Sequence, residues 1–199
     1  IYMSHYAPHW PLQAKEEDVG QYLKLYKKST REDFMQKRLD HLIADDLIPK
    51  GTKLPKSALA AKPARDGYLE IERMALHAAM VESIDRSVAS LVLSLKNAGK
   101  LDNTLIMVFS DNGSSHQLSF DRTVPENVRP GSVDTFLNHG SALAALNNTP
   151  FKDYKMSNYE GGTISPMVIY WPKGLSTKGR ISQRLSHISD IMPTCLELA

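Results

Sequence analysis

The residues that most directly suggest chemistry are Asp111 and Asn112, in the segment Ser-Asp-Asn-Gly at 110–113. They follow an apolar and β-branched run at 104–109, and such a run between turn residues predicts a strand buried on both faces, as in a parallel sheet. Ligands of open α/β sheets bind just beyond the carboxyl ends of the strands. Carboxylate and amide oxygens suit a hard divalent cation. Asp-Asn-Gly is also an ordinary turn sequence, so a metal site and a plain turn both stay open from these residues alone.

His9 is a second candidate, in the sequence Ala-Pro-His-Trp-Pro at 7–11. A short apolar and aromatic segment at 1–6 precedes it and predicts a strand. Because Pro8 and Pro11 lack backbone donors and restrict the residues before them, His9 is expected in a stiff loop just past a strand end. A histidine there could donate a proton or contact an anion. The alternative is a loop histidine that stacks beside Trp10.

Lys155 is a third candidate. It follows Thr-Pro-Phe-Lys-Asp-Tyr at 149–154 and precedes Tyr-Glu-Gly-Gly at 159–162. A strand is predicted at 164–171, so Lys155 lies in a loop that enters the sheet. The lysine ammonium is a point charge that can hold one oxyanion oxygen. A solvated surface lysine is the alternative.

The elements that must position these residues follow from hydrophobic periodicity. Apolar positions between 16 and 46 predict one or two surface helices, and those between 69 and 98 predict a long helix that ends before Gly99. The long helix, a turn and the run at 104–109 make an αβ step, which is typical of a right-handed crossover onto a parallel sheet. Residues 49–67 are expected to be irregular, 114–148 to form a long loop at the lip of a pocket, and 189–199 to form a helix capped by Ser189 or Asp190.

Residues 114–148 contain two histidines, His116 and His139. Neither has a partner at metal-ligand spacing, and neither receives a role. Two triplets match the N-glycosylation sequon, at 112–114 and at 147–149. A glycan on Asn112 would be incompatible with a metal ion bound there.

The composition narrows the class of protein. The 199 residues are 42% hydrophobic and 23% charged, which is ordinary for a globular domain or part of one. A net charge of +2, from 24 basic and 22 acidic residues, gives no electrostatic case for a nucleic-acid or membrane partner. The single cysteine, Cys195, excludes an internal disulfide and a cysteine metal cluster, and is expected to be a buried helix residue. No signal peptide is recognisable, and both ends read as cut, so we expect an internal piece of a longer protein.

The motifs, taken in order, resemble those of arylsulfatases, the formylglycine-dependent (type I) sulfatases of the alkaline phosphatase superfamily. Each motif is weak by itself, but their order along nearly the whole chain is specific. The matching segments are residues 7–14, 101–104, 110–113, 148–151, 155 with 159–162, 171–172 and 190–194.

The resemblance implies an α/β, alkaline-phosphatase-like fold with a central mixed, mostly parallel sheet flanked by helices, incomplete here. It implies that residues 1–199 are part of the catalytic domain, without the N-terminal half and the C-terminal subdomain. It further implies one Ca²⁺, or Mg²⁺ in some relatives, held in part by Asp111 and Asn112. His9 matches the histidine that contacts the ester and protonates the leaving oxygen, and Lys155 the lysine that binds a sulfate oxygen.

The chemistry agrees with this resemblance. Cleavage of a sulfate ester spreads negative charge over the sulfuryl and leaving oxygens, which a divalent ion, a lysine and a nearby acid can offset. The implied substrate is a small-molecule or carbohydrate sulfate ester, and the implied location is periplasmic, secreted or lysosomal. The sequence sets neither the particular ester nor the oligomeric state.

One departure from the family pattern matters for activity. The family nucleophile is a formylglycine made within a Cys/Ser-x-Pro-x-Arg motif, and the 199 residues contain no such motif. Cys195 is followed by Leu-Glu-Leu and is not that cysteine. We therefore expect formylglycine to be supplied by another part of the protein and this piece alone to be inactive. Two alternatives stay open, a phosphodiesterase or phosphonate monoester hydrolase of the same superfamily and a non-catalytic sulfatase-like binding module.

Overall fold

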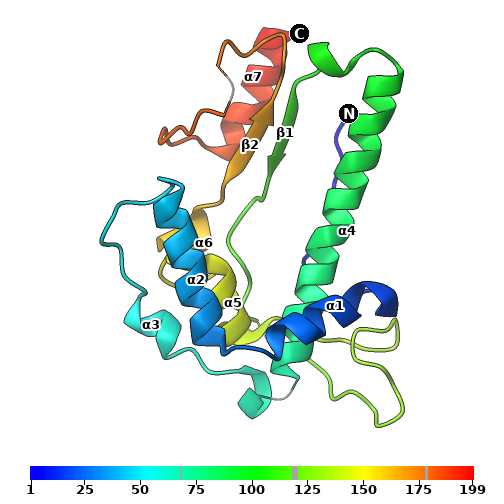
Figure 1. The fold of residues 1–199 in the computed structure, drawn as a ribbon, viewed down its shortest axis with the longest axis vertical. Coiled ribbons are helices and arrows are strands. Elements are labelled where there is room, and N and C mark those ends of the chain that lie inside the picture. Colours follow the sequence, from blue (N-terminus) through cyan, green and yellow to red (C-terminus); the bar gives the residue numbers. More distant parts are fainter. Residues whose placement is uncertain (68, 118–120, 178) are drawn as a thin grey trace.

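The computed structural model describes residues 1–67, 69–117, 121–177 and 179–199. Residues 118–120 of the expected loop at 114–148 lie outside the described part. A helical cluster forms one end of the molecule, and two strands with a C-terminal helix form the other (Figure 1). The helices are α1 (Glu16–Tyr26), α2 (Arg31–Ala44), α3 (Lys56–Leu59), α4 (Glu70–Asn97), α5 (Gly140–Asn148), α6 (Glu160–Thr163) and α7 (Ile191–Leu198), and the strands are β1 (Ile106–Phe109) and β2 (Met167–Tyr170).

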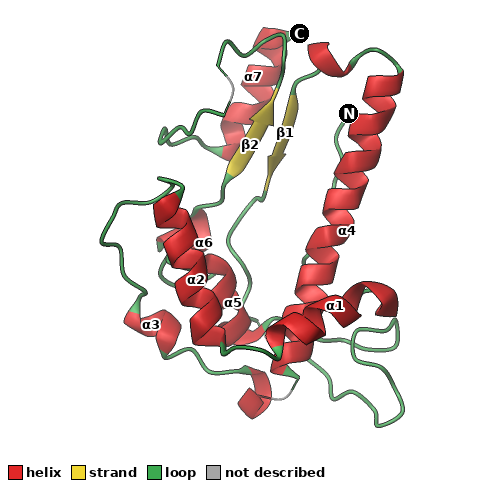
Figure 2. Ribbon diagram, viewed as in Figure 1, coloured by secondary structure: helices red, strands yellow, loops and turns green. Residues whose placement is uncertain are grey.

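The long helix α4 confirms the clearest prediction from the sequence. It begins one residue after the predicted start, and Gly99 follows its end with φ of +65°, a conformation that glycine adopts without strain. Only its first half is buried, and that half contributes Met74, Leu76 and Met80 to the core. Burial of each such side chain stabilises the fold by roughly 1.5–3 kcal/mol. The second half leaves the helical cluster and runs toward the strands (Figure 2).

Residues 16–46 form two helices, α1 and α2, as the apolar spacing predicts. Helix α1 packs on α4, and α2 on α5. Thr30 caps α2, because its hydroxyl accepts from the Asp33 backbone N–H while the Asp33 carboxylate accepts from the Thr30 backbone N–H. These two hydrogen bonds lower the pKa of Asp33. Residues 49–67 are mostly irregular, as expected, apart from α3 and a 3₁₀ turn, η1 (Ala64–Gly67).

The described strands form one antiparallel pair, with Ile106 opposite Tyr170 and Phe109 opposite Met167. The prediction that 104–109 is buried on both faces is wrong for this chain, because Val108 and Phe109 are 40% and 36% exposed. The predicted strand at 1–6 is also absent, and this segment is exposed. A strand needs a partner for its backbone groups and cover for its faces. Among the described residues, β1 has its partner in β2 but its faces are only partly covered, and residues 1–6 have no partner strand.

The segment 114–148 is not entirely a loop, since α5 occupies its last nine residues. The sequence prediction missed this helix because nearly all its residues are buried, so it has no polar face to produce a 3.6-residue period. The run Ala-Leu-Ala-Ala-Leu at 142–146 could have indicated a helix, because alanine and leucine have high helix propensity. Helix α5 contacts α2, α3, α4 and α6 and is therefore the centre of the helical cluster.

The C-terminal helix is confirmed as α7, with Pro193 in its first turn. Asp190, one of the two expected caps, is the N-cap residue of α7, although its side chain makes no hydrogen bond to that helix. The Asp190 carboxylate instead accepts from the His187 backbone N–H and caps the preceding 3₁₀ turn, η3 (Ile188–Asp190). Cys195 lies in α7 as a free cysteine, partly exposed rather than buried. Across the described residues, no helix combines the length and the apolar character that crossing a membrane requires.

Candidate active site

The Asp111–Asn112 turn directly follows β1. The Asp111 side chain is exposed, and within the described part of the chain no hydrogen bond or ion pair engages its carboxylate. The Asn112 Nδ2 donates to the Gly113 carbonyl oxygen at 3.0 Å, which leaves the Asn112 amide oxygen as the atom able to bind a cation. The Ser110 hydroxyl donates to the Asn112 carbonyl at 3.0 Å and tightens the turn.

The loop that carries Lys155 lies against this turn. The Lys155 backbone N–H donates to the Ser114 carbonyl at 3.0 Å, and the Gly113 N–H donates to the Gly162 carbonyl at 3.2 Å. A β-carbon on Gly113 would lie 1.8 Å from the Gly161 carbonyl oxygen, so only glycine permits this approach. The structure thus brings together the Asp-Asn-Gly turn and the Lys155 loop, two candidates that the sequence placed on separate segments.

Two consecutive asparagines at the end of α5 both contact Ser114, and the second also contacts the Lys155 loop. The Asn148 side-chain oxygen accepts from the Ser114 backbone N–H at 2.8 Å, and its Nδ2 donates to the Asp153 carbonyl at 3.0 Å. The Asn147 Nδ2 donates to the Ser114 hydroxyl at 3.2 Å. Asn147 is therefore engaged within the protein, which disfavours the glycosylation that the sequon at 147–149 suggests.

His9 lies half-buried in its loop, between aromatic rings. Its ring centroid is 4.7 Å from that of Trp10 and 5.5 Å from that of Tyr6. The His9 Nδ1 is 2.7 Å from the Trp10 carbonyl oxygen. Because a carbonyl only accepts, Nδ1 carries a hydrogen, and Nε2 is the nitrogen left to exchange a proton. The His9 and Trp10 rings lie side by side but are tilted by 41° rather than stacked, and this contact leaves Nε2 available for chemistry.

Two further histidines, which were not among the candidates from the sequence, lie near the His9 loop: His139 is buried and His77 is partly exposed. The rings of His139 and His77 are 5.2 Å apart, edge to face. Burial, followed by the nearby charge of His77, lowers the pKa of His139 to about 3, against a hydrogen bond to the Pro8 backbone that raises it. Burial and then the charge of Arg38 lower the pKa of His77 to about 4. Both rings are therefore neutral at physiological pH.

These histidines connect the His9 loop to the other candidates. The charge of His9 lowers the pKa of His139, and Asn147 Nδ2 lies 3.3 Å from His77 Nε2. Among the described residues, no hydrogen bond joins His9 directly to Asp111, Asn112 or Lys155. The connection instead runs through His139, His77 and Asn147.

A buried ion pair supports the start of α5. Arg73 Nη2 is 2.8 Å from the Asp121 carboxylate, and both side chains are at most 2% exposed. The same carboxylate accepts from the Asn138 backbone N–H at 3.0 Å, and Arg73 also donates to the Asn138 carbonyl. The charged pair thereby fixes the backbone immediately before His139.

Asp111 and Asn112 fit part of a divalent-cation site, since both provide hard oxygen donors at an exposed turn. The described residues contain no group of three or more His, Cys, Asp or Glu side chains able to hold a metal ion. The pair can therefore contribute to such a site without completing it.

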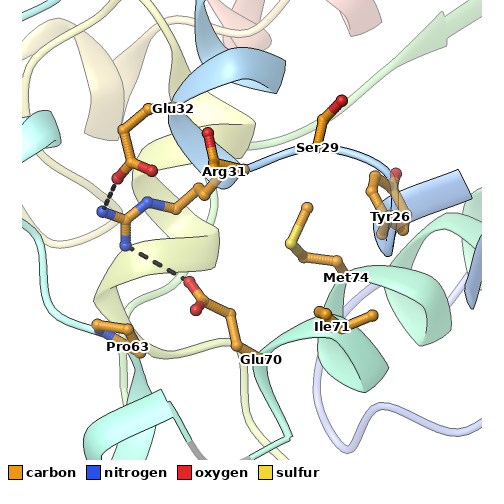
Figure 3. A pocket seen from close by; sticks show the side chains of 9 residues that line it. Tyr26, Ser29, Arg31, Glu32, Pro63, Glu70, Ile71 and Met74 are labelled. Carbon is orange, nitrogen blue, oxygen red and sulfur yellow. Dashed lines mark hydrogen bonds and ion pairs between the residues drawn. The ribbon is translucent and has the colours of Figure 1, made fainter.

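A pocket of about 290 Å³ lies elsewhere, between the start of α2 and the start of α4. Figure 3 shows Arg31 between Glu32 and Glu70, with nitrogen–oxygen distances of 2.6 and 3.5 Å. Burial raises the pKa of Glu70, and the charge of Arg31 opposes this shift. None of the four candidate residues lines this pocket. We interpret it as a junction between helices.

Comparison with known proteins defines the family. A family model described as Sulfatase matches residues 1–199, and the chain belongs to that family. The family membership and a solved relative agree with the predicted alkaline-phosphatase-like fold, of which this chain contains a part.

Two curated relatives and one solved structure illustrate the similarity. An uncharacterized sulfatase of Schizosaccharomyces pombe is 29% identical over 100% of this chain and 38% of its own length. The arylsulfatase of Klebsiella aerogenes is 30% identical over 97% of this chain and 44% of its own length. The chain thus spans less than half of either relative. The crystal structure of Ps i-CgsB in complex with k-i-k-neocarrahexaose is 27% identical, with a TM-score of 0.54, over 96% of this chain and 27% of that one.

Proposed function

We propose that the protein containing this chain hydrolyses a sulfate monoester: water enters, the sulfur–oxygen bond of the ester breaks, and an alcohol or phenol and inorganic sulfate leave. The observation that carries the proposal is the match to the sulfatase family over residues 1–199. The contact between the Lys155 loop and the Asp111–Asn112 turn supports it, because two groups for an anionic substrate then share one region.

Each candidate has a distinct role in this proposal. Lys155 binds a sulfuryl oxygen and offsets the negative charge that grows there. His9, in its protonated form, donates a proton from Nε2 to the leaving oxygen. Asp111 and Asn112 supply two oxygen ligands to Ca²⁺ or Mg²⁺, which when bound stabilises charge on the sulfuryl group.

The nucleophile belongs to another part of the protein in this proposal. We expect it to be a formylglycine, since the 199 residues lack a Cys/Ser-x-Pro-x-Arg motif. The chain by itself is then inactive, although it carries four of the site residues. The family also supports a periplasmic, secreted or lysosomal location.

The substrate class we favour is an aryl or carbohydrate sulfate. The name of the Klebsiella relative supports the first, and the oligosaccharide in the solved relative supports the second. The exposed residues of the loop after Ser114 would select between them, because the sulfate head group is common to both.

The test is release of sulfate from 4-nitrophenyl sulfate and from a sulfated oligosaccharide by the intact protein, with bis(4-nitrophenyl) phosphate and a phosphonate monoester as comparators. Faster turnover of the sulfates supports the proposal. Faster turnover of the phosphorus esters would favour a phosphodiesterase or phosphonate hydrolase. Binding of substrate with no turnover of any ester would favour a non-catalytic module. Turnover by the purified 199-residue chain would contradict the proposed inactivity of the piece.

A further inference from the structure

The Asn147 side-chain amide bridges two segments that are distant in sequence. Its Nδ2 lies 3.2 Å from the Ser114 hydroxyl and 3.3 Å from His77 Nε2. An amide nitrogen carries two hydrogens, so it can donate to both atoms at once. His77 Nε2 must then act as the acceptor, which requires the neutral imidazole with its hydrogen on Nδ1.

The Asn148 side chain makes a second bridge from the same end of α5. Its oxygen accepts from the Ser114 backbone N–H, and its nitrogen donates to the Asp153 carbonyl. Ser114 lies two residues after Asn112, and Asp153 lies two residues before Lys155. Asn148 is buried, so water competes poorly for these hydrogen bonds.

The backbone hydrogen bond from Lys155 to Ser114 closes a small network around these bridges. Ser114 is held by its N–H, its carbonyl and its hydroxyl, each by a different residue. A residue fixed at three atoms has little freedom to move relative to α5.

We propose that Asn147 and Asn148 are positioning residues. Asn148 holds the Asp111–Asn112 turn and the Lys155 loop at a fixed spacing, and Asn147 ties Ser114 of that turn to His77 on α4, which orients the Asn147 amide. This inference rests on the proposed function only for its catalytic consequence. The bridging itself is a structural property of the chain. None of the three side chains needs to touch substrate.

The first experiment compares Asn148→Ala, Asn148→Asp and Asn97→Ala in the intact protein. Aspartate keeps an acceptor for the Ser114 N–H but loses the donor to Asp153, and Asn97 is an exposed control on α4. Hydrogen–deuterium exchange of the Ser114 and Lys155 amides should accelerate in Asn148→Ala, less in Asn148→Asp, and not in the control. The value of kcat per folded protein should fall about 10–100-fold in Asn148→Ala, because small misplacements of catalytic groups are costly.

The second experiment tests His77. In His77→Gln the amide oxygen can replace Nε2 as acceptor, so kcat should stay within about threefold of wild type. In His77→Phe the acceptor is lost, and kcat should fall about tenfold. The same two substitutions at His41, which is exposed on α2, are the matched controls.

Each outcome bears on the proposal. Unchanged Ser114 exchange and unchanged kcat in Asn148→Ala would overturn it. A lower melting temperature with normal kcat per folded protein would also overturn it, since that result indicates a merely structural role. If Asn148→Ala fails to fold, the proposal is tested instead by amide exchange and kcat in Asn148→Asp and by kcat in the two His77 variants. If wild-type protein releases no sulfate, the proposed function is wrong, while amide exchange still tests whether the asparagines hold the two loops.

Discussion

The Lys155 backbone N–H donates to the Ser114 carbonyl at 3.0 Å, which ties the loop of a candidate sulfate-binding lysine to the turn of two candidate metal ligands. Because the bond is between backbone atoms, it does not depend on the ionisation of the lysine. Substitution of the Lys155 side chain should therefore remove the ammonium group and leave the backbone hydrogen bond to Ser114 in place.

Replacement of Lys155 by alanine is expected to lower kcat/KM for 4-nitrophenyl sulfate about 10²–10³-fold, the usual cost of one group that stabilises charge in a transition state. Lys152→Ala is the matched control, because Lys152 is exposed and its Nζ lies 3.5 Å from the Tyr159 ring centroid. Steady-state kinetics of the intact protein provide the measurement. Equal losses in the two variants would argue against a specific role for Lys155.

The effect of His9→Asn should depend on the leaving group. General-acid catalysis contributes about 10²–10⁴-fold, and more of it is needed when the departing oxygen is basic. We expect a large loss for an alkyl or carbohydrate sulfate and a small one for 4-nitrophenyl sulfate, whose phenolate leaves readily. His5→Asn is the control, since His5 is exposed in the same segment. A uniform loss across leaving groups would indicate that His9 binds the ester without protonating it.

Asp111→Asn should weaken Ca²⁺ binding to the intact protein about tenfold or more, because the number of charged ligands sets the affinity for this ion. Isothermal titration calorimetry measures this effect without reference to activity. Asp102→Asn, an exposed aspartate before β1, should leave the affinity unchanged. Wild-type Ca²⁺ affinity in Asp111→Asn would exclude Asp111 as a ligand.

Stability should decrease as pH falls below the ordinary histidine pKa of 6.5. The pKa values of His77 and His139 are lowered to about 4 and about 3, so the unfolded chain binds more protons than the folded one in this range. The contribution of these two neutral histidines to the free energy of unfolding is fully present above pH 6.5. At pH 5 the loss is about 2 kcal/mol for buried His139, and less for His77, which keeps some exposure.

Urea unfolding of the intact protein at pH 7 and pH 5 measures this loss. His77→Gln should make the free energy of unfolding less dependent on pH. An identical pH dependence in wild type and His77→Gln would show that His77 does not titrate differently on folding.

Local sequence patterns were sufficient for several parts of the fold. The apolar repeat at 69–98 predicts α4 because a helix that buries one stripe leaves a 3.6-residue period in the sequence. The two helices between 16 and 46 follow for the same reason. The order of short motifs indicated the sulfatase family, which the family match over 1–199 confirms. The roles of His9, Lys155, Asp111 and Asn112 are still predictions.

Other features depended on contacts between distant residues. Helix α5 has no polar face, so its sequence lacks the alternation that reveals a surface helix. The exposure of β1 depends on what packs against its faces, which its own residues do not specify.

The network around Ser114 was likewise decided by tertiary structure. Asn147, Asn148 and His77 are common residue types, and nothing in their sequence neighbours indicates that they meet at Ser114. Hydrogen bonds between side chains require distances near 3 Å, which only the packing of α5 between α4 and the site loops creates. The sequence by itself determined the family and which residues are available for chemistry, because both follow from short motifs and residue types. The tertiary structure decided which of the candidate segments lie against each other and what holds them there, because that depends on distances between segments far apart in the chain.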